Sequence, residues 1–265
     1  MSTGSELRIP CPIPDVRAEN GEAIAHLRIG WMRSVCNIHH AFAIGSFIDE
    51  IAHARGEDPR DVLLEVIGPA RKVTPAELGI DKLPNYGQTL EQHPVDAGRL
   101  RAVVERVTAL ASWDGRKRAG RALGLATHRS FLTYVAVVAS ATRDARGKVH
   151  VDEAWVVVDA GTVLNLDRVR AQMGGAVIFG MSLALHGAIT ARDGAVEQTN
   201  FRDYPVVRIG EAPRVIHVEI VAGDGPPGGI GEPGVPPVAA AIANAVFELT
   251  GIRVRELPPA RAALG

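Results

Sequence analysis

The sequence predicts an α+β fold in which mixed β-sheets pack against helices. Apolar residues recur at three- and four-residue spacing in several stretches, which is typical of amphipathic helices. A central section, residues 124–158, is instead rich in β-branched residues on both sides of a turn. Helices and strands follow each other in runs rather than as regular β–α–β units, which favours α+β. We predict two portions: residues 1–95 with an arm, the loop of Arg33, helices and a long flap, and residues 96–265 as an α+β portion that contains the loop of Glu232.

Composition and charge exclude several classes of function. The chain has 265 residues with 29 basic and 30 acidic side chains, so its formal charge of −1 gives no basis for binding nucleic acid or anionic membranes. The two cysteines, Cys11 and Cys36, have no spacing typical of a zinc site, an iron–sulfur cluster or a disulfide framework, and we expect free thiols. We predict no protein ligand to a metal.

No targeting or membrane segment is predicted. Residues 1–14 lack the basic start and apolar core of a signal peptide, and no apolar run approaches the length of a membrane span. We therefore expect a cytoplasmic location from the absence of a signal in this chain. The alternative is the periplasm, reached with a partner that carries the signal.

The first portion is predicted to hold an extended arm, two helices and a flap. Residues 7–16 form an arm interrupted by three prolines. Residues 41–54 form a helix with one apolar stripe, and residues 59–67 form a second helix that begins at a proline and ends before Gly68. Residues 68–95 contain four prolines and little periodicity, so we expect a long loop with at most one helical turn.

The second portion begins with a predicted helix over residues 97–113, capped by Asp96. Residues 124–130 lead into a strand over 131–140, and a turn at 144–147 returns the chain as a second strand over 149–158. Three further elements are expected: a helix over 165–189, and strands that begin at 197–200 and span 215–221.

The predicted helix over 165–189 contains Gly174, Gly175 and Gly180. Each glycine costs about 1 kcal/mol against alanine unless close approach compensates, so this helix should pack against something large. Gln172 lies on the turn before these glycines, where its amide can reach whatever approaches. The alternative is a glutamine whose hydrogen bonds are satisfied by backbone groups.

The most unusual stretch is residues 226–237, with four glycines and five prolines in twelve positions. These residues predict a stiff, tightly turned loop, followed by an alanine-rich helix over 238–249 that Gly251 ends. Glu232 is the one ionisable residue of the loop, and it is a candidate general base. The alternative is a surface turn whose Glu232 caps the helix. A phosphate-binding loop is less favoured, because the spacing of glycine-rich phosphate loops is missing.

Several motifs, taken in order, resemble one family. They are Gly30–Val35, Ser46–Glu50, Val158–Gly161, Asn165 with Arg170–Gln172 and Gly174–Gly175, Asn200–Pro205, and Pro227–Gly234 followed by Ala243–Val246. Together they are similar to the molybdopterin-binding subunit of the xanthine dehydrogenase and aldehyde oxidase superfamily, in particular its isoquinoline 1-oxidoreductase β-subunit type. The resemblance runs from about residue 9 to the end of the chain and matches the second half of that subunit.

The resemblance implies site residues and a reaction. Glu232 matches the family's catalytic base, which takes a proton from a molybdenum-bound hydroxide so that oxygen from water reaches an aldehyde or an N-heteroaromatic carbon. Gln172 matches a glutamine that hydrogen-bonds the pterin. Arg33 matches an arginine beside the molybdenum site, with the backbone of Ser34 close by, and Gly231 lets the loop approach the metal.

The resemblance also implies cofactors and partners. The expected cofactor is molybdenum with molybdopterin, in the cytosine dinucleotide form, with iron–sulfur clusters on another subunit. Because the chain matches only one half, we expect a second molybdopterin-binding polypeptide and a 2Fe–2S subunit, with this chain a split subunit or a fragment. Cys36 and His39–His40 depart from the family pattern near Arg33. The alternative function is a non-catalytic structural or assembly subunit of such a complex.

Overall fold

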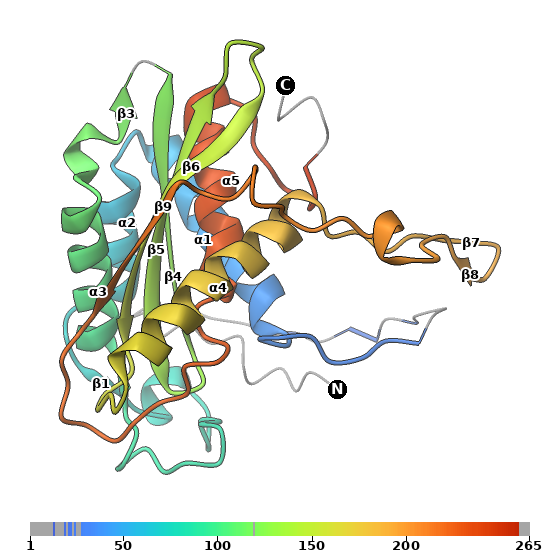
Figure 1. The fold of residues 1–265 in the computed structure, drawn as a ribbon. Helices are drawn as coiled ribbons and strands as arrows, with labels where there is room; N and C mark the ends of the chain where they lie inside the picture. The colour runs from blue at the N-terminus through green and yellow to red at the C-terminus, as the bar shows by residue number, and fades with distance from the viewer. Residues whose placement is uncertain are drawn as a thin grey trace.

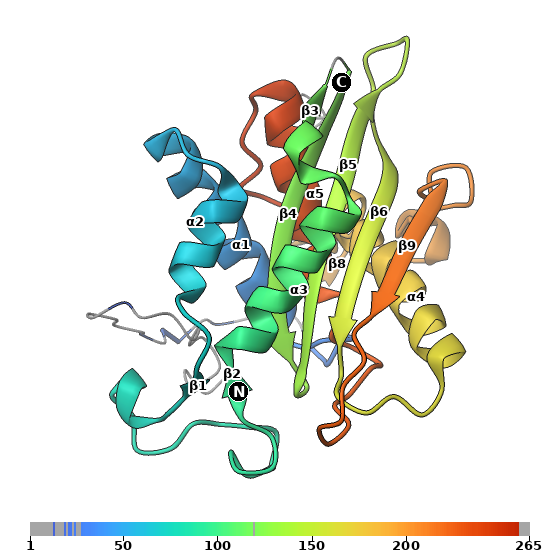
Figure 2. The same cartoon turned by 90° about the vertical axis from the view of Figure 1, so that its left-hand side faces the viewer.

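A computed structural model describes residues 13, 19, 21–22, 24, 28–118 and 120–259. It shows three layers, with a twisted central sheet between two groups of helices (Figures 1 and 2). The predicted α+β class with a mixed sheet is confirmed. Cys11 and nearly all of the arm predicted for residues 7–16 lie outside the described residues.

The central sheet has five strands in the order β3-β4-β5-β6-β9. Their bounds are β3 (Lys117–Arg118), β4 (Arg121–Ser130), β5 (Thr133–Arg143), β6 (Val149–Asp159) and β9 (Val215–Ile220). The first four strands are antiparallel neighbours, and β9 joins the edge of β6 in parallel. Two short antiparallel pairs lie outside this sheet: β1 (Lys72–Val73) with β2 (Val95–Asp96), and β7 (Ala191–Arg192) with β8 (Ala195–Val196).

Five α-helices surround the sheet: α1 (Asn37–Arg55), α2 (Pro59–Ile67), α3 (Ala97–Leu110), α4 (Leu166–Leu185) and α5 (Pro236–Thr250). Three single 3₁₀ turns, η1 (Ala76–Leu78), η2 (Trp113–Gly115) and η3 (Phe201–Asp203), occur in the connections. In Figures 1 and 2, α2 and α3 lie on one side of the sheet and α4 and α5 on the other, while α1 packs between α2 and α5 beside β4.

Strand alternation explains why both faces of the sheet are covered. On β5, Val135 and Val137 belong to the core shared with α4 and α5, while Tyr134 and Ala136 belong to the core shared with α2 and α3. Because neighbouring residues of a strand point to opposite faces, a nearly continuous apolar strand needs helices on both sides. The second core contains residues from before and after position 95, and the division at that position stays a prediction.

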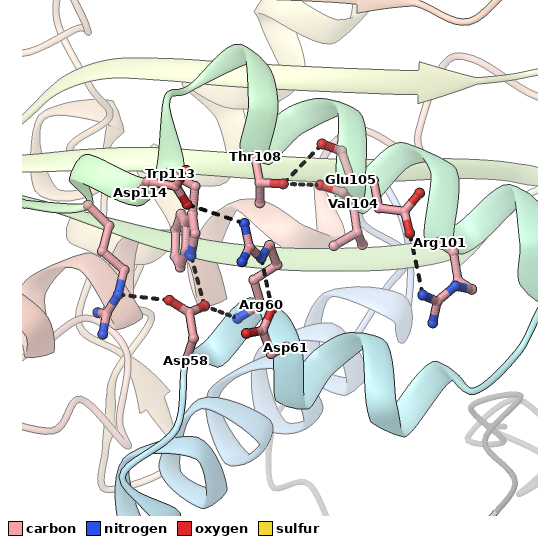
Figure 3. A network of polar contacts seen from close by, with 10 residues as sticks. Asp58, Arg60, Asp61, Arg101, Val104, Glu105, Thr108, Trp113 and Asp114 are labelled. Atoms are coloured by element: carbon pink, nitrogen blue, oxygen red, sulfur yellow. Dashed lines mark hydrogen bonds and ion pairs between the residues drawn. The ribbon is translucent and has the colours of Figure 1, made fainter.

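The α2–α3 side is tied together by the polar network shown in Figure 3. Asp58 caps α2 by accepting the backbone N–H of Arg60 at 2.8 Å, and the same carboxylate oxygen accepts the indole N–H of Trp113 at 2.8 Å. The guanidinium of Arg60 on α2 also forms an ion pair with Asp114 on η2, at 3.5 Å. One capping carboxylate therefore holds the start of α2 against the end of the α3 segment.

Most predicted helices are confirmed, with changes at their ends. The bounds predicted for α2 and the Asp96 cap of α3 are confirmed, with Asp96 accepting from Gly98 N and Arg99 N. Helix α1 begins at Asn37, four residues before the prediction, and so includes both adjacent histidines. The predicted ends at 113 and 189 are wrong, because α3 stops at Leu110 and α4 stops at Leu185.

Two strand predictions are wrong. Residues 124–130 do not lead into the next strand but form their own strand, β4, which turns through Phe131 and Leu132 into β5. Both turn residues have positive φ, 51° and 68°, as a two-residue hairpin requires. Neither is a glycine, so no local residue pattern marks this turn. Residues 197–200 are not a strand. The strand pairing in this region is confined to the β7–β8 hairpin, which ends at Val196.

The chain after α4 extends away from the layered body, with β7 and β8 at the far end (Figure 1), and returns to the core at Val207, whose N–H donates to Ser182 Oγ at 3.1 Å. Phe201 is 91% exposed on this extension, and Ile209, just after it, is 99% exposed. Within the described part of the chain, no helix combines the length and the apolar character that crossing a bilayer requires.

Candidate functional site

The loop of residues 226–237 is fixed by backbone contacts to the sheet. Gly228 N donates to Ala160 O at 2.8 Å, and Gly229 N donates to Phe131 O at 2.8 Å. Thr133 Oγ1 donates to Gly229 O at 2.6 Å. The loop therefore lies across the β4–β5 turn, and its own sequence leaves few alternative conformations.

Two glycines of this loop are required by close packing, and one is not. A Cβ at Gly228 would lie 2.4 Å from Thr133 Oγ1, and a Cβ at Gly234 would lie 2.7 Å from Ala176 Cβ on α4. A Cβ at Gly231 would meet nothing within 4 Å. Gly231 is thus bare backbone facing open space on an otherwise tightly packed loop.

Glu232 is held by the segment that precedes α1, 198 residues earlier in the chain. Ser34 N donates to Glu232 Oε2 at 2.8 Å, and Ser34 Oγ donates to Glu232 O at 2.7 Å. Glu232 is half-buried and Ser34 is fully buried. Helix α5 begins four residues later and has no side-chain cap, so the alternative role of Glu232 as a helix cap is not what the structure shows.

Arg33 joins the same cluster from the other side. Its Nε donates to Gly231 O at 2.7 Å, and its Nη2 donates to Gln172 Oε1 at 3.0 Å. Its guanidinium also lies 5.8 Å from the ring centroid of Phe179 on α4. Burial lowers the pKa of Arg33 and the nearby Glu232 carboxylate partly offsets this, and an arginine remains a cation at any working pH.

Gln172 occupies an exposed position on α4 next to bare backbone. A Cβ at Gly174 or at Gly175 would meet nothing within 4 Å, whereas a Cβ at Gly180 would lie 2.6 Å from Val238 Cβ on α5. The close approach predicted for this helix therefore holds at Gly180, while the surface around Gly174 and Gly175 is left open by this chain. Gln172 Oε1 accepts from Arg33, and no hydrogen bond from Gln172 Nε2 to another described residue is present.

The structure thus brings all five predicted site residues together. Arg33, Ser34, Gln172, Gly231 and Glu232 come from the segment before α1, from α4 and from the glycine–proline loop. The cluster combines one carboxylate, one cation and one exposed amide around backbone without side chains. Such a set can accept a proton at Glu232 and bind a polar, anionic group beside it.

Two further residues support the cluster and were missed by sequence reasoning. Asn37 Nδ2 donates to Ser34 O at 3.1 Å, and Asn37 Oδ1 lies 3.0 Å from His128 Nε2 on β4. Because the Asn37 amide nitrogen already donates to Ser34, its oxygen faces His128, which therefore donates from Nε2. Burial, followed by the proximity of His40 and Arg129, lowers the pKa of His128 to about 3. No pattern in the sequence marks this pair.

Among the described residues, no group of three or more histidine, cysteine, aspartate or glutamate side chains is arranged to hold a metal ion. A metal at this cluster would therefore be carried by a cofactor rather than by the described side chains.

Comparison with known proteins agrees with the resemblance. A family model described as molybdopterin cofactor-binding domain matches residues 61–213. The chain is 32% identical over 254 residues to a membrane-bound aldehyde dehydrogenase (pyrroloquinoline-quinone) from Gluconacetobacter polyoxogenes, covering 92% of this chain and 30% of the relative. It is 31% identical over 232 residues to isoquinoline 1-oxidoreductase subunit beta from Brevundimonas diminuta, covering 86% of this chain and 26% of the relative. The chain thus spans less than a third of the length of either relative.

A solved structure confirms the fold. The aldehyde oxidoreductase from Desulfovibrio desulfuricans superposes with a TM-score of 0.63 at 14% identity, over 86% of this chain and 40% of that one. The family model covers more than half of the chain. The chain therefore belongs to the molybdopterin-binding family of the xanthine dehydrogenase and aldehyde oxidase superfamily.

Proposed function

We propose that this chain supplies the catalytic base and one wall of the cofactor site of a molybdenum hydroxylase. Its substrate class is an aldehyde or an N-heteroaromatic compound, and water is the source of oxygen. The observation that carries the proposal is the Glu232 carboxylate, held at 2.8 Å by Ser34 N next to the Arg33–Gln172 pair. The names of the two relatives, which refer to an aldehyde and to isoquinoline, support the substrate class.

The residues of the cluster fit a molybdopterin cofactor, and the form that we propose is the cytosine dinucleotide. The open space beside Gly174, Gly175 and Gly231 admits a large group close to the backbone. The unused amide N–H of Gln172 offers a donor to a pterin, and the cation of Arg33 suits an anionic ligand. When bound, molybdopterin supplies the metal-centred redox chemistry, which no side chain of this cluster can perform.

In this proposal, Glu232 accepts a proton while its neighbours fix its position. Ser34 N–H holds Oε2, while the second carboxylate oxygen forms no hydrogen bond with a described residue and can take the proton. Ser34 Oγ holds the Glu232 backbone, and Arg33 holds the carbonyl of the preceding residue. A base whose carboxylate and backbone are both fixed needs little reorganisation as the proton moves.

The proposed partners are a second molybdopterin-binding polypeptide and a 2Fe–2S subunit that removes electrons. The chain spans 30% and 26% of the two relatives, so most of the length of those proteins has no counterpart in these residues. The open face around Gln172 and Gly175 is where we place the second polypeptide.

The test is Glu232→Gln in the complex purified with its partners. General acid–base catalysis contributes about 100- to 10,000-fold, so turnover should fall at least about 100-fold while molybdenum and cytosine nucleotide content stay unchanged. Glu219→Gln, which alters a surface carboxylate paired with Arg106 at 2.9 Å, is the matched control and should retain turnover.

Two results would contradict the proposal in different ways. Turnover that survives Glu232→Gln in molybdenum-replete complex would show that Glu232 is not the base, and would favour a non-catalytic subunit. A purified complex without molybdenum and cytosine nucleotide would contradict the proposed cofactor, whatever the role of Glu232.

A further inference from the structure

A cavity of about 160 Å³ lies between α1, α2, the loop of residues 68–95 and β4. None of Arg33, Ser34, Gln172, Gly231 or Glu232 is on its wall, although Asn37 and His128, the pair that supports Ser34, are. Most of its wall is apolar, formed by residues such as Ile44, Ile48, Leu63, Ile67, Leu83 and Tyr86.

The size of this cavity suits one aromatic ring. A cavity of about 150 Å³ in another protein takes up benzene, so a space of this volume is large enough for one aromatic ring. An empty space of this size costs stability because the side chains around it lose van der Waals contacts. A ligand that restores those contacts would bind favourably.

One charged group on the wall has no counter-ion among the described residues. Arg129 on β4 donates from Nη2 to Asn85 Oδ1 at 2.6 Å, and its buried Nε has no hydrogen-bond partner among the described residues. Arg129 also forms no ion pair with any described residue, although its guanidinium lies 5.7 Å from the ring centroid of Tyr134. A partly buried cation with an unused N–H is costly unless an anionic acceptor reaches it.

Among the described ionisable groups on the cavity wall, Arg129 is the one charge without a counter-charge. Asp49 is paired with Arg253. His128 keeps some accessible surface, as a side chain on a cavity wall does, but it is surrounded by protein and its pKa is lowered to about 3, so it is neutral. The wall therefore presents apolar surface with a single positive charge.

We propose that this cavity binds a small aromatic carboxylate, with its ring among the apolar side chains of α1 and α2 and its carboxylate on Arg129. A carboxylate beside the guanidinium would supply the missing counter-ion. A neutral aromatic molecule would fill the space without compensating the charge. The proposal stands independently of the reaction proposed for Glu232.

The test is calorimetric titration of the full chain with benzoate, and with benzamide as a neutral molecule of the same shape. Benzoate should bind the unmodified chain more tightly than benzamide does. Arg129→Gln keeps a donor for Asn85 but removes the charge, so it should weaken benzoate binding at least about tenfold and leave benzamide binding unchanged. Arg121→Gln, on the same strand but paired with Glu153 at 3.4 Å outside the cavity, is the control and should change neither affinity.

A second variant tests the location. Leu63→Trp places a larger side chain into the cavity and should abolish binding of both compounds, with circular dichroism melting to show that the chain remains folded. Benzoate should also raise the melting temperature of the unmodified chain, and should not raise that of Leu63→Trp. Absence of benzoate binding, equal binding of benzoate to the Arg129→Gln chain, or binding that survives in folded Leu63→Trp would each overturn the proposal.

Discussion

Ser34 and Val35 adopt backbone conformations that their side chains disfavour. Their φ angles are 76° and 52°, in the left-handed region, where a β-branched residue such as Val35 is strained. Strain of this kind costs about 1–3 kcal/mol per residue and persists only where the surroundings impose it. Here the Ser34 N–H donates to the Glu232 carboxylate, and the Ser34 carbonyl accepts from the Asn37 side-chain amide. The strained residue therefore connects the candidate base to the supporting pair Asn37–His128.

The lowered pKa of His128 predicts that the stability of the folded chain depends on pH. Its pKa is lowered to about 3 in the folded chain, from an ordinary value of 6.5, so the unfolded chain binds the proton more readily. The neutral histidine therefore contributes its full stability above pH 6.5, and this contribution is lost as the pH falls from 6.5 toward 3. The loss is about 1.4 kcal/mol per pH unit within that window.

The measurement is urea unfolding of the unmodified chain and of His128→Gln between pH 7 and pH 4. Glutamine keeps a donor for Asn37 but does not titrate, so the difference in unfolding free energy between the two proteins should shift steadily in favour of the variant as the pH falls. Parallel stability curves would contradict the buried neutral histidine. The same change at exposed His39 controls for replacing a histidine on the neighbouring helix α1.

At the scale of elements, the two halves of α4 have different surroundings. Toward its C-terminal half it packs on α5, where Gly180 lets the two backbones approach. Toward its N-terminal half it carries Gln172 and the open surface at Gly174 and Gly175, beside the glycine–proline loop. Glycine thus allows close packing within this chain at position 180 and leaves open surface at positions 174 and 175.

This difference predicts opposite effects of the same substitution. Gly180→Ala places a Cβ 2.6 Å from Val238 Cβ and should destabilise the chain by about 1–3 kcal/mol. Gly174→Ala meets nothing within 4 Å and should stabilise it by about 0.5–1 kcal/mol, because alanine loses less conformational entropy in a helix. Urea unfolding of the two variants checks both signs, and a destabilised Gly174→Ala chain would show that this face is already covered.

On the scale of the whole molecule, several large apolar side chains lack cover from the described residues. Phe201 and Ile209 are 91% and 99% exposed, and Trp31 is 81% exposed on the segment that leads to Arg33. Exposed apolar surface marks protein interaction sites where it gathers into patches. We expect these side chains to belong to a large obligate interface, which typically buries more than about 2,000 Å².

The double variant Phe201→Ser, Ile209→Ser should therefore reduce co-purification with the proposed molybdopterin-binding partner at least about tenfold, without lowering the stability of this chain. Pull-down from cells that express both polypeptides, followed by size-exclusion chromatography, measures this. Leu110→Ser, at a residue of α3 that is 39% exposed on the other side of the sheet, is the control. A chain that elutes as a stable monomer at native size and binds no partner would contradict an obligate interface.

Local sequence alone determined much of this protein. Proline and glycine fix the loop of residues 226–237, Asp96 caps α3, and Pro59 and Gly68 bound α2, because each of these signals acts within a few residues. The ordered motifs identified the family, and through it they predicted Glu232, Gln172 and Arg33 as site residues. Only the tertiary structure decided how these residues meet, since the contacts of Glu232 with Ser34 and of Arg33 with Gly231 each join residues 198 positions apart. The same reason applies to the Asn37–His128 pair, 91 positions apart, and to the cavity beneath α1: long-range packing brings such residues together and leaves no local pattern in the chain.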